Sequence, residues 1–329
     1  MANLRAGLIG LGMMGRHHAR VLSSLPGVDL VAVADAAGDP HKVAGSRPVL
    51  GSVEELIAVG IDYCLVAVPT AFHEPVGMAL AEAGVHAMIE KPLAQNIEGA
   101  QRLADAFAAK GLVGAVGHIE RYNPALQQAR ARIESGELGQ VFQITTRRQG
   151  PFPARIADVG VVKDLATHDI DLTAWVARQP YQAVSARTAN RSGRPHEDLV
   201  AITGILADGT VTNHLVNWLS PLKERVTIIT GEKGAFVADT LTADLTFYAN
   251  GLIATTWDDV ARFRGVSEGD VLRFAIAKPE PLRVEHENFR DAILGKEADI
   301  VTMEQGLRTV VVAEAAIESA RTGATVSVA

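Results

Sequence analysis

The chain has 329 residues, of which 48% are hydrophobic and 21% are charged, and its formal net charge is −7. This length and composition are typical of a packed globular protein with two domains. The acidic balance, with no long run of Lys or Arg, argues against nucleic-acid binding, which needs a basic surface to displace counterions. No apolar run approaches the roughly 20 residues that span a bilayer, and the N-terminus lacks a signal-peptide layout, so we expect no membrane association.

Cysteine and histidine usage narrows the chemistry further. Cys64 is the only cysteine, so no internal disulfide can form, and we expect a cytoplasmic protein. It lies in an apolar run without a cationic neighbour, which favours a core thiol over a nucleophile. We expect no metal site, because His17 and His18 are adjacent and the HEN segment at 286–288 lacks the second His of a zinc-binding helix.

The first 35 residues predict a strand, a glycine turn, a helix, a second strand and an acid. The strands are Arg5–Ile9 and Leu30–Ala34, and the second runs directly into Asp35. The turn has G-x-G-x-x-G spacing and consists of Gly10, Gly12 and Gly15. This order is the fingerprint of a dinucleotide-binding βαβ unit.

Each part of this fingerprint has a physical role. The first glycine permits the tight turn, the second lets the backbone approach a pyrophosphate, and the third lets the helix pack on the strand. The pyrophosphate would rest on the helix N-terminus, where Met13 and Met14 form the first turn. Asp35, about 20 residues past the last glycine, would accept hydrogen bonds from the adenine ribose. The alternative, a glycine-rich turn in a sugar- or peptide-binding domain, does not explain the acid.

Asp35 also bears on the choice of cofactor. Its carboxylate would repel the 2′-phosphate of NADP, and no Arg follows it directly, so we expect NAD. His41, Lys42 and Arg47 are close in sequence and would soften that repulsion, which leaves room for NADP as a second cofactor.

Strands and helices continue to alternate up to about residue 120, which predicts a doubly wound parallel sheet of the Rossmann type. The predicted elements are strands at Ile61–Val68, Val85–Ile89 and Leu112–Gly117 and helices at His73–Gly84 and Ile97–Lys110. Ligands of such sheets bind beyond the carboxyl ends of the strands. We therefore expect the following residues on one rim, in addition to the glycines and Asp35: Pro69, Thr70, His73, Glu90, Lys91 and His118.

The pattern changes after Arg121–Pro124. The later segments predict two helices, at Ala125–Ser135 and about Met303–Arg321, and an open, mainly antiparallel sheet. Its expected strands are Val141–Arg148, Gln182–Ala189, Leu199–Ala207, Val211–Trp218, Arg225–Thr230, Gly234–Asp239 and Leu245–Tyr248. The fold class is thus α/β, with a NAD-binding domain at 1–120 and an α+β domain at 121–329 for substrate binding and oligomerisation.

Three side chains suit hydride transfer from a secondary alcohol. Asp164 and His168 are four residues apart in a predicted helix and share a face, and Lys91 ends a predicted strand. The imidazole would remove the hydroxyl proton, and the ammonium would stabilise the developing alkoxide. The alternative for Asp164 and His168 is a surface ion pair, and a lone Lys at a strand end is usually solvated.

Five segments together resemble the family of glucose–fructose oxidoreductase, inositol dehydrogenase and MocA: GLIGLGMMGRHHARVL, VAVPTAFHEP, EKP, GHIERYNP and DLATHDIDL. The resemblance covers essentially the whole chain and implies a Rossmann domain followed by an open-faced sheet that builds homodimers or homotetramers. It assigns Lys91 as the catalytic lysine, His168 as the acid/base and Asp164 as the carboxylate that binds substrate or orients the site. It also implies a cis peptide between Lys91 and Pro92.

The segment GPFPARIADVGVV, together with GHIERYNP and DLATHDID, is similar to a subgroup that acts on UDP-N-acetylglucosamine at C3. A UDP-sugar carries a diphosphate, and guanidinium groups bind phosphate oxygens bidentately. Arg147, Arg148, Arg155 and Lys163 cluster in sequence, but Arg147 and Arg148 alternate on a strand, so Arg155 and Lys163 are the preferred substrate-binding residues.

Tyr122 and Asn123 are further candidates at the domain junction, where they would touch the nicotinamide or anchor the crossover. The leading hypothesis is NAD-dependent oxidation of a UDP-N-acetylhexosamine at C3. The alternatives are an inositol, polyol or free-sugar dehydrogenase and a dinucleotide-binding sensor without turnover.

Overall fold

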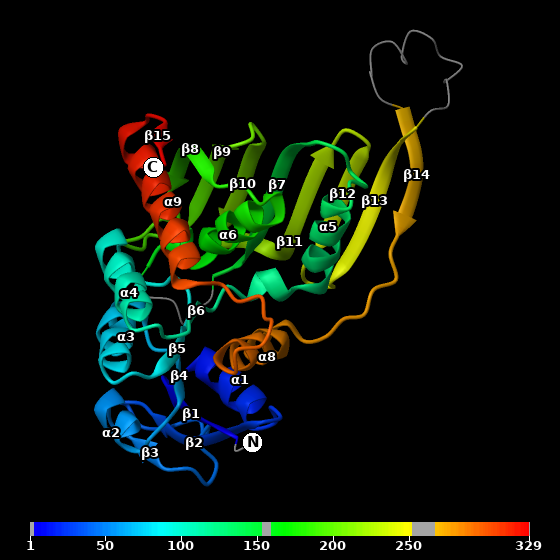
Figure 1. The fold of residues 1–329 in the computed structure, drawn as a ribbon. Coiled ribbons are helices and arrows are strands. Elements are labelled where there is room, and N and C mark those ends of the chain that lie inside the picture. Colours follow the sequence, from blue (N-terminus) through cyan, green and yellow to red (C-terminus); the bar gives the residue numbers. More distant parts are fainter. Residues whose placement is uncertain (1–2, 153–158, 252–266, 329) are drawn as a thin grey trace. The chain divides into compact units, whose positions relative to one another are not determined.

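The computed structural model describes residues 3–152, 159–251 and 267–328 (Figure 1). They form two compact units: Met1–Ile119 with Glu280–Glu314, and Glu120–Pro279 with Ala315–Ala329. The sequence predicted one division, at residue 120, whereas Glu280–Glu314 returns to the first unit. Among the described residues, no helix is long and apolar enough to cross a membrane.

The first unit is built on a parallel sheet of six strands in the order β3-β2-β1-β4-β5-β6. The strands are β1 (Leu4–Ile9), β2 (Val28–Ala34), β3 (Val49–Leu50), β4 (Tyr63–Val66), β5 (His86–Ile89) and β6 (Gly114–Val116). This is the strand order of dinucleotide-binding domains, and the order reverses between β1 and β4. Ligands of such sheets bind at the carboxyl ends of the two strands at this reversal.

Helices cover both faces of this sheet (Figure 1). They are α1 (Met13–Leu22), α2 (Val53–Ala58), α3 (His73–Glu82), α4 (Ile97–Ala109) and α8 (Pro281–Ile293), with a 3₁₀ turn η1 (Thr70–Phe72) before α3. One core cluster joins α1 and α8 to the sheet through Leu22, Leu8 and Phe289, and the other includes α2, α3 and α4. The sequence predicted α1, α3 and α4 but not α2 or α8.

The second unit is built on a nine-stranded sheet in the order β14-β13-β12-β11-β7-β10-β9-β8-β15. The strands are β7 (Val141–Pro151), β8 (Tyr181–Ala189), β9 (Leu199–Leu206), β10 (Val211–Asn217), β11 (Leu219–Gly231), β12 (Gly234–Asp239), β13 (Asp244–Gly251), β14 (Ser267–Arg273) and β15 (Val326–Ser327). Its described pairs are antiparallel except for β7 with β10. The predicted α/β class with a mainly antiparallel second sheet is confirmed.

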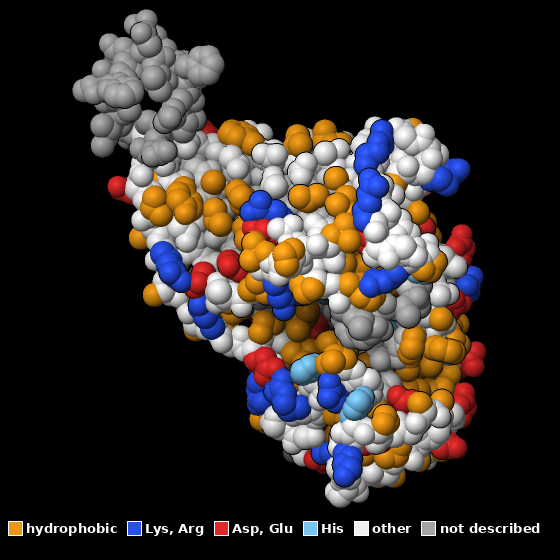
Figure 2. All heavy atoms as spheres, turned by 180° about the vertical axis from the view of Figure 1, so that it is seen from behind, with side chains coloured by type: hydrophobic (Ala, Val, Ile, Leu, Met, Phe, Trp, Pro, Cys, Tyr) orange, Lys and Arg blue, Asp and Glu red, His pale blue; other side chains and the backbone are white. Residues whose placement is uncertain are grey.

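Helices cover one face of this second sheet (Figure 1). The second unit contains a short 3₁₀ turn η2 (Ile119–Tyr122), α5 (Pro124–Glu134), a π-helical turn η3 (Val162–Ala166), α6 (Thr167–Ala177) and the end of α9 (Met303–Thr322). The α5 and α6 side chains pack on inward-facing strand residues such as Ile144, Ile229 and Phe236. Figure 2, seen from behind, shows hydrophobic side chains exposed on the opposite face.

A buried histidine in this second sheet makes the fold sensitive to acid. The His214 ring bonds Thr146 Oγ1 at 2.8 Å and the Tyr181 hydroxyl at 2.8 Å, and burial lowers its pKa to about 3. The unfolded chain takes up a proton on this ring below about pH 6.5, whereas the folded chain does not, so stability falls as the pH drops from about 6.5 toward 3.

We therefore expect His214→Gln to flatten this decline, which is about 1.4 kcal/mol per pH unit for one group. The measurement is the urea midpoint between pH 7 and pH 4. His41→Gln, at an exposed position, is the control and should leave the slope as in the wild type. An unchanged slope in His214→Gln would contradict the assignment.

Candidate active site

The glycine turn between β1 and α1 has the geometry that a pyrophosphate requires. Gly10 has φ +94°, and a Cβ there would lie 2.5 Å from the backbone of Ala67. A Cβ at Gly15 would lie 1.9 Å from the Gly10 carbonyl oxygen, so the helix can approach the strand only without a side chain. A Cβ at Gly12 would meet nothing within 4 Å, and this residue is the N-cap of α1. The position facing the helix N-terminus is therefore open, as an anion there needs.

Asp35 follows β2 and is tied to the glycine turn. Its Oδ2 accepts a hydrogen bond from the Leu11 N–H at 2.7 Å, and its Oδ1 accepts one from the Ala37 N–H at 2.8 Å. Each oxygen keeps a second lone pair, so a ribose diol can still donate to the carboxylate. The residues expected for NAD therefore fit the cofactor on both the pyrophosphate and the ribose side.

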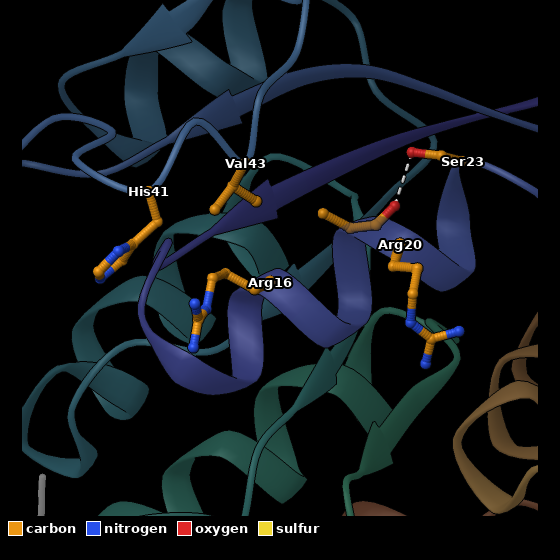
Figure 3. A pocket seen from close by; sticks show the side chains of 6 residues that line it. Arg16, Arg20, Ser23, His41 and Val43 are labelled. Atoms are coloured by element: carbon orange, nitrogen blue, oxygen red, sulfur yellow. Dashed lines mark hydrogen bonds between the residues drawn. The ribbon is translucent and has the colours of Figure 1, made fainter.

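A pocket beside α1 contains two of the residues that could interact with the 2′-phosphate of NADP, Arg16 and His41 (Figure 3). It has a volume of about 210 Å³ and is lined by Arg16, Ala19, Arg20, Ser23, His41 and Val43. Arg20 pairs with Glu280, and Figure 3 shows it extending away from Arg16 and His41. Arg47, one of the three cations expected here, instead donates to the carbonyls of Leu30 and Ala44 and to the Ser23 hydroxyl.

The ends of β4 and β5 carry the next predicted residues. Pro69 and Thr70 follow β4, and Glu90 and Lys91 follow β5. The Lys91–Pro92 peptide is cis, as the resemblance implied. His73 is buried, and its ring nitrogens lie 2.8 Å from the Pro92 carbonyl and 3.0 Å from the Val68 carbonyl. These contacts favour a role in joining the two strand ends over a contact with the nicotinamide. His118 is also buried.

Asp164 lies in the turn η3, which precedes α6, and His168 is the second residue of α6, so the two do not share one regular helix. Val162–Ala166 is a π-helical turn, in which hydrogen bonds run from i to i+5, so four residues fall short of a full turn. Such turns recur at functional sites. Asp164 is 4% exposed and His168 is partly buried. The burial of Asp164 argues against a surface ion pair.

Glu197, which the sequence did not single out, holds the start of this π turn. Its Oε1 accepts a hydrogen bond from the Val162 N–H at 3.1 Å, and its carbonyl accepts one from the Val161 N–H at 3.0 Å. A Cβ at Gly160 would lie 2.1 Å from the Glu197 carboxylate, so the glycine makes room for this cap. The contact fixes the position of Lys163 and Asp164 in the second unit.

A buried ion network holds α6 against the sheet. Arg148 donates to Asp169 Oδ2 and Glu120 Oε1, both at 2.8 Å. Arg121 binds Asp171 with two hydrogen bonds of 2.8 and 2.6 Å. The GHIERYNP and HDID segments thus contribute structural ion pairs as well as the candidate base. Sequence spacing could not pair these residues, because the partners lie far apart in the chain.

The pKa values of the two carboxyl groups around Arg148 shift in opposite directions. Burial raises the pKa of Asp169, with Arg148 opposing it. Burial also acts to raise the pKa of Glu120, but Arg148 and Arg225 outweigh it and lower that pKa. Burial and the nearby Arg148 lower the pKa of Arg225, which remains 32% exposed on its side chain. The carboxylates of Glu120, Asp169 and Asp164 act on the pKa of Arg225 in the opposite direction.

The cations proposed to bind a diphosphate differ in their burial and in their ion-pair partners. Arg148 is buried and engaged by two carboxylates, so it is a structural residue, and Arg147 is exposed but pairs with Glu224. Arg155 lies outside the described residues. Lys163 lies next to Asp164 on the π turn, and Arg225 is a partly exposed cation close to Asp164 that the sequence did not reveal.

Asn123 and Tyr122 are both buried at the start of α5. The Asn123 Oδ1 accepts a hydrogen bond from the Ala125 N–H at 3.0 Å, and its Nδ2 donates to the Thr240 carbonyl at 3.0 Å. It caps the helix and ties it to the sheet. This supports the anchoring alternative for Asn123.

Comparisons with known proteins agree with this fold. Residues 4–118 match the family model described as "Oxidoreductase family, NAD-binding Rossmann fold", and residues 130–328 match its "C-terminal alpha/beta domain". UDP-N-acetylglucosamine 3-dehydrogenase of Acidithiobacillus ferrooxidans is 33% identical over 217 residues, which are 65% of this chain and 66% of that protein. Its solved structure superposes with a TM-score of 0.85 and 27% identity over 98% of this chain and 99% of that chain.

Two further relatives differ in what their names say they act on. The scyllo-inositol 2-dehydrogenase (NAD(+)) of Bacillus subtilis is 30% identical over 192 residues, which are 55% of this chain and 56% of that protein. GenD2 from gentamicin A biosynthesis, solved in complex with NAD, superposes with a TM-score of 0.82 and 26% identity over 99% of this chain and 97% of that chain. The aligned segments thus span less than two thirds of the two curated relatives. The NAD prediction is confirmed by the family model.

Proposed function

The chain belongs to the Gfo/Idh/MocA family of oxidoreductases, and from that premise we propose that it oxidises a secondary alcohol of a sugar or polyol with NAD. The finer proposal is oxidation at C3 of a UDP-N-acetylhexosamine. The observation that carries the proposal is the set of groups at two strand and helix ends: Lys91 beyond β5 of the NAD-binding sheet, and the buried Asp164 with His168 at the start of α6.

The proposed roles follow from the chemistry of these groups. NAD, when bound, accepts the hydride of the carbinol carbon. His168 would take the hydroxyl proton, so that the alcohol loses one hydride and one proton and becomes a ketone. The Lys91 ammonium would stabilise the negative charge that develops on the oxygen, and Asp164 would orient the substrate hydroxyl.

A partly exposed cation supports the nucleotide-sugar form of the proposal. Arg225 lies close enough to Asp164 to feel its charge, and Lys163 is the residue next to Asp164. Both suit a diphosphate near a sugar held by Asp164. The proposal for the polyol alternative rests on the inositol relatives, and it needs no cation at this position.

The test is an assay of NADH formation with NAD and a panel of UDP-N-acetylglucosamine, UDP-N-acetylgalactosamine, free N-acetylglucosamine, glucose and myo-inositol. We expect turnover of a UDP-sugar. We also expect Arg225→Met to raise the KM for that UDP-sugar by roughly ten- to a hundredfold, because the variant loses one charge-assisted contact. Arg147→Met is the control, because Arg147 is exposed and pairs with Glu224. Turnover of myo-inositol or glucose alone would favour the polyol alternative, and no turnover of any substrate would favour the sensor.

Cofactor choice gives a second expected result. Asp35→Asn removes the charge but keeps an acceptor for the Leu11 N–H, so we expect weaker NAD binding by about tenfold and a relative gain for NADP. We expect Arg16→Met in the Asp35→Asn background to remove that gain, because Arg16 and His41 line the pocket beside α1 and could bind a phosphate. Fluorescence titration of both cofactors measures the ratio. A wild-type protein with a strong preference for NADP would refute this account of Asp35.

The exposed face of the nine-stranded sheet supports a homodimer or homotetramer. Ile205 pairs with Val211 across β9 and β10, and both point away from α6, as do Leu215 and Ile228. Water contacts this apolar area unless a second copy covers it. We expect the wild type to be oligomeric in light-scattering chromatography and Leu215→Asp to shift it to monomer. The control is Leu294→Asp, at an exposed position in the first unit, which should leave the oligomeric state unchanged. A monomeric wild type would refute the proposal.

Two remaining expectations stay predictions. Because the composition is acidic, we expect the protein to act on a small-molecule substrate and to have no nucleic-acid or membrane partner. The expected cytoplasmic location rests on Cys64, the one cysteine of the sequence, which cannot form an internal disulfide. Burial raises the pKa of its thiol, which keeps the thiol protonated and unreactive.

A further inference from the structure

Four titratable side chains gather in the first unit, beneath the segment that carries Lys91. They come from three elements that are far apart in sequence: His18 from α1, Glu90 from the end of β5, and Glu285 and His286 from α8. His18, Glu285 and His286 are each 1% exposed. Among the described residues, no group of three or more His, Cys, Asp or Glu side chains could hold a metal ion.

Three of these side chains form a continuous hydrogen-bonded chain. His18 Nε2 lies 2.9 Å from Glu90 Oε1, and His18 Nδ1 lies 2.9 Å from His286 Nε2. Burial works against the Glu90 carboxylate, but His18 and the charge of Lys91 outweigh it and lower the pKa of Glu90. A carboxylate only accepts hydrogen bonds, so the His18 Nε2–H must donate to it.

The far end of the chain is neutral. Burial and then the neighbouring His18 hold the pKa of His286 well below its ordinary value. The hydrogen bond between His18 Nδ1 and His286 Nε2 fixes the orientation of the two rings relative to each other. Burial and then the charge of Glu90 raise the pKa of Glu285 well above its ordinary value. The cluster therefore carries its negative charge at Glu90.

Glu90 is held in turn against the backbone of the catalytic segment. Its Oε2 accepts a hydrogen bond from the Lys91 N–H at 3.2 Å. A Cβ at Gly117 would lie 3.2 Å from Glu90 Cδ and 3.3 Å from its Oε2, so the carboxylate fills the space that a side chain there would need. One oxygen of Glu90 is thus bound to the histidine chain and the other to the peptide of Lys91.

We propose that His18 and His286 are positioning residues, which act through Glu90 to fix the backbone from which the Lys91 side chain projects. The inference rests on the proposed role of Lys91. The hydrogen bond from His18 selects the rotamer in which Glu90 reaches the Lys91 N–H, and the hydrogen bond to His286 holds the His18 ring in the orientation that reaches Glu90. Neither histidine needs to touch substrate or cofactor. α8 thereby contributes to the active site from the far end of the chain.

Matched substitutions at His18 test the proposal. His18→Gln keeps an N–H within reach of Glu90, whereas His18→Leu removes the donor and keeps comparable bulk. We expect His18→Leu to lower kcat by about ten- to a hundredfold, the effect of a misplaced catalytic group, with KM and the Kd of NAD within about twofold of the wild type. We expect His18→Gln to recover most of the loss. Equal kcat values in the two variants, or a wild-type kcat in His18→Leu, would overturn the proposal.

The result is separable from a failure of the proposed function. If the wild type has no turnover, or if Lys91→Met keeps full turnover, the role of Lys91 is wrong whatever the histidines do. A second measurement needs no activity: nitrogen NMR of labelled imidazoles should find a proton on His18 Nε2 that is protected from exchange. Glu90→Gln should remove that protection or move the resonance. A rapidly exchanging His18 ring in the folded wild type would also overturn the proposal.

Discussion

Replacing Lys91 with Met is expected to lower kcat for alcohol oxidation by about a hundredfold to ten-thousandfold, the usual range for removal of a group that assists proton transfer or stabilises charge in the transition state. Met keeps the length and apolar stem of Lys, so the segment after β5 should keep its fold. NAD binding should change little, because the glycine turn and Asp35 supply the contacts expected for the pyrophosphate and the ribose. Steady-state kinetics with a cofactor titration measures both quantities.

Lys110→Met is the matched control for this result. Lys110 lies in the same unit at the end of α4, where it is exposed and its Nζ donates to the Glu82 carbonyl. Its replacement should leave kcat unchanged. His168→Asn should reproduce the loss seen in Lys91→Met, and the double variant should lose less than the product of the two, since both groups act on one oxygen. A normal kcat in Lys91→Met would end the dehydrogenase proposal in its present form.

The second large effect is expected on stability. Arg148→Met should lower the free energy of unfolding of the second unit by about 3–5 kcal/mol, because it leaves Asp169 and Glu120 buried without their shared cation. Tryptophan fluorescence in a urea titration reports this unit, because Trp175 and Trp218 are buried in it and the sequence has no Trp at 1–119 or 280–314. A lower midpoint at an unchanged slope indicates lost stability alone.

Two further variants separate the buried charge from the loss of a large side chain. Arg147→Met is one residue away on the same strand, but Arg147 is exposed, and its replacement should cost less than about 1 kcal/mol. Adding Glu120→Gln and Asp169→Asn to Arg148→Met removes the two carboxylates that Arg148 pairs with and should restore part of the loss. If Arg148→Met and Arg147→Met had equal midpoints, the network would not hold α6 in place.

The sequence predicted the parts of the fold that depend on local pattern. Alternating strands and helices predicted the parallel sheet, and the spacing of Gly10, Gly12 and Gly15 predicted the turn. A side chain at Gly10 or Gly15 would clash with nearby backbone, and Gly12 faces open space at the helix N-terminus. Period-two alternation gave most strands of the second sheet. The position of Asp35 also followed from spacing alone.

The features that the sequence did not predict depend on contacts between distant segments. Arg148 has the same sequence signature as Arg147, and only the register of β7 against its neighbours shows which of the two is buried. α8 has polar residues at Glu285 and His286 on its buried side, so its pattern does not look like a core helix. The π turn at Asp164 also has no signal in residue spacing, because it depends on the cap that Glu197 supplies from another loop.

The return of Glu280–Glu314 to the first unit affects how the protein is made. Phe289 packs against Tyr63 with ring centroids 5.5 Å apart, and Val301 and Leu307 lie in the same core cluster as β4 and α4. During translation residues 1–119 leave the ribosome first but lack these side chains until Glu280–Glu314 has emerged. Until then a nascent chain must carry an uncovered apolar surface on β1 and β4, and a fragment of the first 120 residues would keep that surface permanently.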